Sequence, residues 1–217
     1  MSKPLIILGT SGLAREMAQV VRKVNEQTHA WDFRGFVGVD TGETGKDLGF
    51  GRVLGDDAWL LAQDEPFDLV VGIGYPKIRA RALQPYLTAG ERFSFPNLIH
   101  PQATLDLDQV AMGQGNVLTV GTVFTCNVGI GDFNLFNWNV TVGHDTRVGS
   151  YNVINPGSNI SGFVELGDRI LVGTGCQVLE TRKVGSDATL GAGSLVREDV
   201  EAGVTVVGVP AKPRPAR

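Results

Sequence analysis

A bulky apolar residue stands at every sixth position from Met112 to Val196, with no change of phase. A period of six is neither the 3.6 of an amphipathic helix nor the 2 of a half-buried strand. It is typical of a solenoid, in which three hexads form one triangular coil and residues eighteen apart lie one above another. The periodic residues are Met112, Leu118, Phe124, Ile130, Phe136, Val142, Val148, Ile154, Ile160, Leu166, Val172, Val178, Val184, Leu190 and Val196.

Glycine follows the periodic residue in eight hexads, and we expect it to permit corner conformations that a Cβ would strain. Small or apolar residues such as Val128 and Cys176 recur two positions before the next periodic residue. The pattern predicts five full coils of a parallel β-helix from Met112 to about Glu201, after a less regular cap that includes residues 100–103. The eight glycines are Gly113, Gly131, Gly143, Gly149, Gly167, Gly173, Gly185 and Gly191.

The first half of the chain alternates short apolar runs with segments of helical spacing. Such alternation predicts an α/β domain with a parallel sheet and helices on its faces. The expected strands are 4–8, 33–39, 67–73 and 93–99, and the expected helices are 13–25, 56–63 and 76–89. The predicted domains are therefore residues 1–99 and residues 100–217.

Charge and composition narrow the function classes. The net charge of −4 and the pI of about 5.4 argue against a nucleic-acid surface and against binding to anionic membranes. No apolar run reaches the roughly 18 residues of a membrane span, and the first residues lack a signal-peptide pattern. Cys126 and Cys176 fit reduced thiols better than a disulfide. We expect a cytoplasmic protein.

Several short segments, in this order and spacing, make the chain resemble a known family over nearly its full length. They are Ile6–Gly12 with Arg15 and Glu16, Gly35–Val37 leading to Asp40, Gly72–Gly74 followed by Arg79, Leu98–Pro101, Asn137 seven residues before His144 and Asp145, and Gly208–Lys212. The family is that of bacterial sugar acetyltransferases with an N-terminal nucleotide-sugar domain. It includes sialic acid O-acetyltransferases and enzymes that N-acetylate nucleotide-linked 4-amino sugars.

The resemblance implies a Rossmann-like first domain and a left-handed β-helix that binds acetyl-CoA. It also implies a homotrimer, with each acyl-CoA site between neighbouring subunits. The expected reaction moves acetyl from acetyl-CoA to the amino group of a nucleotide-linked amino sugar.

Acetyl transfer to an amine or a hydroxyl needs a base, and histidine is the side chain best matched to that task near neutral pH. The chain has three histidines. His29 lies in a polar stretch, and His100 lies at the junction of the two halves, where a structural role is expected. His144 falls near a coil corner, and the resemblance implies that it is the base, with Asp145 as the residue that orients it. The resemblance places Asn137 near the acceptor.

The resemblance also marks positions for the two substrates. For acetyl-CoA these are Gly157, Gly173, Thr174, Gly191, Ala192, Lys212 and Val153, which replaces a second histidine that the family often has nine residues after the base. For the nucleotide sugar they are Gly9, Thr10, Ser11, Gly12, Asp40 and Gly74. The first four stand between a strand and a helix, where backbone N–H groups and the helix dipole can receive a phosphate. The glycine fingerprint is incomplete, so a dinucleotide is not required. The family often carries paired acidic residues near Asp40, which Gly38-Val39 does not reproduce, so the identity of the nucleotide stays open.

Two alternatives stay open at this point. One is O-acetylation of sialic acid or another sugar hydroxyl. The other is a non-catalytic solenoid that serves as a binding module. A zinc site with three histidine ligands is not expected, because the repeats contain only His144. An acyl-cysteine on Cys126 is not expected either, because nothing in the adjacent sequence would activate that thiol.

Overall fold

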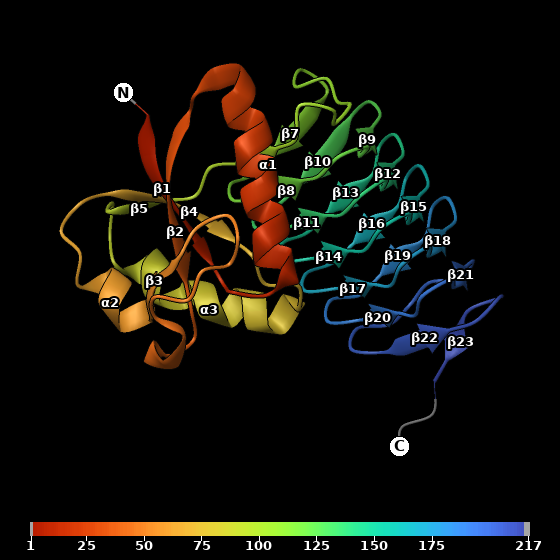
Figure 1. The fold of residues 1–217 in the computed structure, drawn as a ribbon. Helices are drawn as coiled ribbons and strands as arrows, with labels where there is room; N and C mark the ends of the chain where they lie inside the picture. Colours follow the sequence, from red (N-terminus) through yellow and green to blue (C-terminus); the bar gives the residue numbers. More distant parts are fainter. Residues whose placement is uncertain (1, 215–217) are drawn as a thin grey trace. The chain divides into compact units, whose positions relative to one another are not determined.

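In a computed structural model, the described residues, 2–214, form two compact units. The first comprises the residues up to Gly74 together with Ile78–Pro101. The second comprises Tyr75–Lys77 and the chain from Gln102 on. Figure 1 shows the elements of both units, and each unit is described by itself below.

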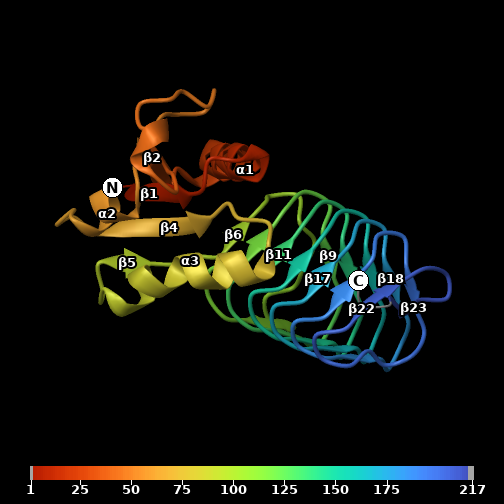
Figure 2. The same ribbon diagram turned by 90° about the horizontal axis from the view of Figure 1, so that it is seen from below.

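The first unit is built on a five-stranded parallel sheet with the order β3-β2-β1-β4-β5. Its elements are β1 (Lys3–Leu8), α1 (Gly12–Thr28), β2 (Trp31–Val37), the short 3₁₀ turn η1 (Thr41–Glu43), β3 (Val53–Gly55), α2 (Asp57–Leu61), β4 (Phe67–Val71), α3 (Pro76–Thr88), β5 (Phe93–Ser94) and β6 (Leu98–Ile99). Figure 2 shows β4 between α1 and α3. The strand order reverses direction between β1 and β4, and the carboxyl ends of such strands are the usual place for a ligand crevice.

The predicted elements of this unit are confirmed except at two places. The sequence missed β3, whose three residues are too few to show a period. The expected strand 93–99 is divided into β5 and β6, because Pro96 between them has no N–H to donate to a strand ladder. Helix α2 begins with an acidic N-cap: the Asp56 carboxylate accepts a hydrogen bond from the Trp59 N–H at 2.9 Å.

The second unit is a left-handed parallel β-helix, and its successive coils are stacked in Figures 1 and 2. One face holds β7 (Val110–Met112), β10 (Val128–Ile130), β13 (Arg147–Val148), β16 (Glu165–Leu166) and β19 (Lys183–Val184). The second holds β8 (Val117–Leu118), β11 (Leu135–Phe136), β14 (Val153–Ile154), β17 (Leu171–Val172), β20 (Thr189–Leu190) and β22 (Thr205–Val207), which pairs antiparallel with β23 (Lys212–Pro213). The third holds β9 (Val123–Phe124), β12 (Thr141–Val142), β15 (Asn159–Ile160), β18 (Gln177–Val178) and β21 (Leu195–Val196).

The period of six sets the register of this unit. Paired residues on the central coils are eighteen apart, as in Val142 beside Ile160. Fourteen of the fifteen periodic side chains are buried, and Met112, on the first coil, is half-buried. The core also contains a ladder of buried amides, in which the Asn134 side chain donates to Asn116 and the Asn152 N–H donates to Asn134. Each buried amide is thereby satisfied by its neighbour one coil away.

The reason predicted for the regular spacing of the glycines is wrong. Among the glycines that follow a periodic residue, none has a positive φ. A Cβ on Gly143, for example, would lie 2.6 Å from the backbone nitrogen of Gly162 on the next coil. These positions need glycine because the next coil approaches closely. The left-handed residues come two positions later and are mostly not glycine, as at Asn127, Phe133 and Tyr151.

Within residues 2–214, no helix has the length and apolar character needed to cross a membrane.

Candidate active site

Two corners of the β-helix carry the residues predicted for catalysis and for acetyl-CoA. The His144 corner consists of the turns 125–127, 143–145, 161–163 and 179–181 together with Arg182, which follows the last of these turns, and Arg197, which follows β21. The glycine corner consists of the turns 119–121, 137–139, 155–157, 173–175 and 191–193. Both corners border the face formed by β9, β12, β15, β18 and β21. Within one chain, they therefore lie at opposite edges of one sheet face.

His144 and Asp145 lie together at the turn after β12. The His144 side chain is 48% exposed, and its Nδ1 lies 2.9 Å from Asp145 Oδ2. Asp145 has a left-handed backbone, with φ of 59°, and its carboxylate also accepts a hydrogen bond from the Asn127 amide one coil earlier. These hydrogen bonds, first from His144 and then from Asn127, hold the pKa of the Asp145 carboxyl below its usual range. Asp145 is therefore an anion that fixes one side of the imidazole.

The other ring nitrogen of His144, Nε2, lies on the side of the ring that Asp145 does not contact. Among the described residues, none forms a hydrogen bond with Nε2. The Phe163 ring meets the imidazole edge to face, with ring centres 5.1 Å apart, and is itself 53% exposed. An imidazole held at Nδ1 and open at Nε2 is the arrangement that a general base requires.

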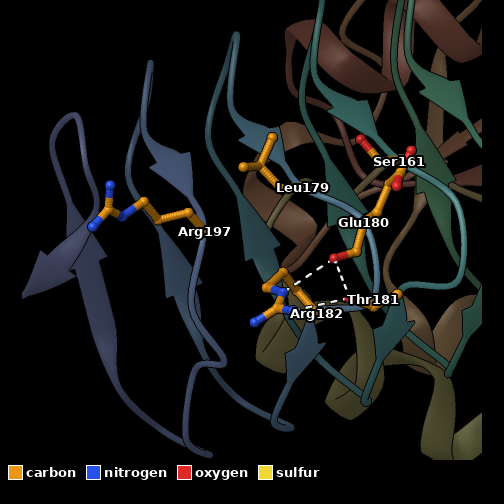
Figure 3. A pocket seen from close by; sticks show the side chains of 6 residues that line it. All are labelled: Ser161, Leu179, Glu180, Thr181, Arg182 and Arg197. Carbon is orange, nitrogen blue, oxygen red and sulfur yellow. Dashed lines mark hydrogen bonds between the residues drawn. The ribbon is translucent and has the colours of Figure 1, made fainter.

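A shallow cavity of about 440 Å³ extends along the same corner, and Figure 3 shows the six side chains that line it. It begins at Ser161, one coil beyond His144, and ends at Arg197, three coils beyond. At about 4.8 Å per coil, this corresponds to roughly 5–14 Å along the corner. Arg182 is tied to the Glu180 carbonyl at 3.1 Å and to the Thr181 hydroxyl at 2.9 Å, whereas the Arg197 side chain is 59% exposed. Neither arginine was predicted from the sequence, because they carry no motif of their own.

The glycine corner brings most of the predicted acetyl-CoA residues into one column. Its turns stack directly: the Gly175 N–H donates to Pro156, and the Gly193 N–H donates to Thr174. Asn137 is only 8% exposed, and its amide oxygen accepts from the Trp138 N–H at 3.1 Å. The predicted members of this column are Gly157, Gly173, Thr174, Gly191 and Ala192.

Two other predicted acetyl-CoA residues lie outside this column. Val153 belongs to β14 and is 1% exposed. Lys212 is exposed in β23.

In the first unit, the predicted glycine loop lies where the strand order reverses. Gly9 has φ of 111°, and a Cβ there would be 3.0 Å from the Gly72 carbonyl oxygen, so both features require glycine. Ser11 is the N-cap of α1 but gives no side-chain cap, and its hydroxyl lies 3.4 Å from the same Gly72 oxygen. A Cβ on Gly74 would contact Leu13 at 3.3 Å. The loops after β1 and β4 thus meet with their backbones nearly in contact.

Two charged residues support these loops. Arg79 is fully buried, and its Nη1 donates to the carbonyls of Val71 at 2.9 Å and Ile73 at 3.1 Å. Burial lowers the pKa of the Arg79 guanidinium to about 9, so the group is still a cation at neutral pH. Glu43, which the sequence analysis did not single out, accepts a hydrogen bond from the Thr10 hydroxyl at 2.6 Å.

Asp40 has a different role from Arg79 and Glu43. Its carboxylate accepts from the Gly42 N–H at 2.8 Å and so caps η1, which leaves Glu43 as the carboxylate in contact with the loop after β1.

No three His, Cys, Asp or Glu side chains in the part of the chain that the structure describes are grouped to hold a metal ion.

Comparison with known proteins identifies the family. The chain is 30% identical to the acetyltransferase domain of PglB from Neisseria gonorrhoeae in complex with acetyl coenzyme A, with a TM-score of 0.87, covering 99% of this chain and 100% of that chain. The chain belongs to the bacterial sugar acetyltransferases. The predicted family, the predicted fold and the predicted class of enzyme, an acetyltransferase, are thereby confirmed.

Other members of this acetyltransferase family match over the same length. A mutant of perosamine N-acetyltransferase from Caulobacter crescentus, in complex with CoA and GDP-perosamine, is 29% identical, with a TM-score of 0.88, over 98% of this chain and 97% of that chain. WeeI from Acinetobacter baumannii is 26% identical, with a TM-score of 0.84, over 97% and 99%. The family model of the PglD N-terminal domain matches residues 4–85. A search of curated proteins gives no match.

Proposed function

We propose that the protein transfers the acetyl group of acetyl-CoA to the amino group of a nucleotide-linked amino sugar. One observation carries the proposal: an exposed imidazole, held by a carboxylate at Nδ1 and open at Nε2, in a chain that matches sugar acetyltransferases from end to end. Two of those relatives were crystallised with acetyl coenzyme A or with CoA and a GDP-linked sugar, which supports the same pair of substrates here.

The reaction is a direct transfer between two bound substrates. His144 Nε2 takes a proton from the attacking amine, while Asp145 holds Nδ1 and balances the positive charge that develops on the ring. The amine nitrogen forms a bond to the thioester carbon, and the carbon–sulfur bond breaks. Coenzyme A leaves as the thiol after its sulfur receives the proton that His144 Nε2 took from the amine, which returns the imidazole to its neutral form. No covalent enzyme intermediate is required.

The corners of the β-helix provide two surfaces for the donor. For the coenzyme phosphates the proposal uses Arg182 and Arg197, which line the cavity and whose neighbouring carboxylates, Asp199 and Glu198, lie 3.8 Å away. In its later coils the glycine corner carries only small side chains, in the turns Gly173-Thr174-Gly175 and Gly191-Ala192-Gly193. Because these corners lie at opposite edges of one face, one donor would meet both most simply if that face packs against a neighbouring subunit. A homotrimer of this kind is part of the proposal.

For the nucleotide, the proposal uses the loops after β1 and β4 in the first unit. The N-terminus of α1 carries no acidic residue in its first turn, and the cationic Arg79 lies under the Val71–Ile73 backbone. Both features favour an anionic group such as a diphosphate at these loops. A cytoplasmic location, where nucleotide sugars and acetyl-CoA are both present, completes the proposal.

The test is thiol release from acetyl-CoA, measured with UDP-, GDP- and TDP-linked amino sugars and with free sialic acid. Each acceptor is run with the wild-type protein and with His144→Ala. Turnover with one nucleotide-linked amino sugar, lost in the variant, is the expected result and also identifies the nucleotide. Turnover with sialic acid alone would replace the proposal by O-acetylation. No turnover, together with no acetyl-CoA binding by calorimetry, would make the protein a binding module.

A further inference from the structure

The imidazole of His144 lies over Gly162, on the next coil. A Cβ placed on Gly162 would be 2.7 Å from His144 Cε1, 2.8 Å from Nε2 and 3.1 Å from Nδ1. Packed carbon atoms normally stay about 3.5–4.0 Å apart, so even one methyl group would overlap the ring. These ring atoms are the three nearest neighbours of that position. The space that a side chain would fill is occupied by the His144 ring.

The glycines that the coils need for stacking face backbone atoms of the next coil, and Gly162 does not. A Cβ on Gly173 would meet the backbone carbonyl carbon of Gly191 at 2.7 Å, and one on Gly185 would meet Ala202 Cα at 2.7 Å. At Gly162 the obstacle is a side chain. The backbone there is outside the left-handed region, so alanine can adopt its conformation.

The other coils show that the fold accepts a side chain at this position. Residues eighteen apart occupy equivalent places, and the equivalents of Gly162 are Cys126, His144, Glu180 and Glu198. Glycine occurs in this column only directly after the histidine. The requirement for glycine at residue 162 therefore comes from the imidazole and not from the coil.

We propose that Gly162 is a positioning residue for the catalytic base. Its missing side chain lets the imidazole lie flat toward the next coil, with Nδ1 on Asp145 and Nε2 open to the acceptor. Phe163 packs against a further side of the ring, since its own ring meets the imidazole edge to face and its N–H donates to the His144 carbonyl at 2.8 Å. This inference rests on the proposed role of His144 as the base.

The test compares Gly162→Ala with the wild-type protein in the acetyl-transfer assay. The methyl group must turn the ring, which breaks the Nδ1 contact with Asp145 and moves Nε2 by about an ångström. A displacement of that size can cost on the order of 100-fold in rate. We expect kcat to fall about 10- to 100-fold, with KM for acetyl-CoA within about twofold of wild type and an unchanged melting temperature. A purely structural glycine would lower the melting temperature.

Two matched variants complete the design. Gly185→Ala, whose methyl meets backbone atoms far along the helix, is expected to lower the melting temperature without a selective loss of kcat. Gly162→Ala combined with His144→Ala is expected to be no slower than His144→Ala alone, because the overlapping ring is gone. A wild-type kcat in Gly162→Ala, or an equal further loss in the His144→Ala background, would overturn the inference.

A failure of the proposed function would be visible separately. In that case the wild-type protein itself gives no turnover, and a crystal structure of Gly162→Ala decides instead. Loss of the contact between His144 and Asp145 in that structure would support the inference, and an unmoved ring would overturn it.

Discussion

The His144 corner and the glycine corner follow the same backbone path with very different side chains. On both, the third residue of the turn is left-handed: Asp145 and Phe163 on one, Gly157 and Gly175 on the other. At the first two positions of these turns, the side chains of the glycine corner are small in the later coils, as in Gly173-Thr174. The His144 corner instead carries a histidine, a carboxylate, an aromatic ring and two arginines. In a solenoid the inward residues fix the backbone, so outward chemistry can change from coil to coil.

The largest effect should come from removing His144, the proposed base, from the His144 corner. For His144→Ala we expect kcat to fall roughly 10³-fold, within the usual range for loss of a general base. Unfolding by denaturant should be unchanged, since the side chain is about half exposed. A variant that kept more than a tenth of the wild-type rate would contradict the assignment of the chemistry to the His144 corner.

Substitution of a closely packed glycine in the glycine corner should lower the free energy of unfolding. In Gly173→Ala the methyl would overlap the backbone of the next coil, and overpacking of this kind costs about 1–3 kcal/mol of unfolding free energy. The matched change on the His144 corner is Ser161→Ala, which shortens a side chain that the fold already accepts and should cost less than about 0.5 kcal/mol. Denaturant unfolding of both variants measures the difference. Equal stabilities would show that close approach is not what selects glycine at residue 173.

The arginines of the cavity should affect the donor. We expect Arg197→Gln and Arg182→Gln each to weaken CoA binding about tenfold, as for one lost charge-assisted hydrogen bond. Calorimetry with CoA, and with a pantetheine thioester that lacks the nucleotide phosphates, checks the cause: only CoA binding should weaken. Lys183→Gln is the control, because Lys183 pairs with Glu165 on another face. Equal losses in all three variants would point to net charge alone.

The two cysteines should give the smallest change in rate. Cys126 lies exposed one coil before His144, whereas Cys176 is buried, and burial raises the pKa of its thiol to about 12. We expect Cys126→Ser to keep the rate within about twofold, and a thiol reagent to label Cys126 well before Cys176. A large loss of rate in Cys126→Ser would revive a covalent route through an acyl-cysteine.

The repeat could be predicted from the sequence because a single rule, one inward apolar residue per hexad, holds over fifteen positions. The same rule gave a wrong account of the glycines. A period shows that a position is special, but close approach of the next coil and a left-handed φ both select glycine. Only coordinates separate Gly143, which faces backbone, from Gly157, which is left-handed and faces open space.

The site was predicted in part. Local motifs pointed to His144 and Asp145, which are adjacent in the chain. Gly162 and Arg197 belong to the same corner only through the stacking of coils, and adding eighteen to residue 144 would have found the first. In the first unit, β3 and Glu43 follow an irregular stretch without periodicity, so their positions depend on contacts that the sequence does not display.

The stacked register of the His144 corner gives the enzyme a fixed scale of length. Each coil adds about 4.8 Å, so the backbone of any residue on this corner stands at a whole number of such steps from the coil of His144. Arg197 is three steps away. A single substitution can change the side chain on a given coil, but it cannot change the distance of that coil from His144. A donor with a longer or shorter arm could be matched only by the gain or loss of an entire eighteen-residue coil, and one extra coil would move the cations without disturbing the imidazole.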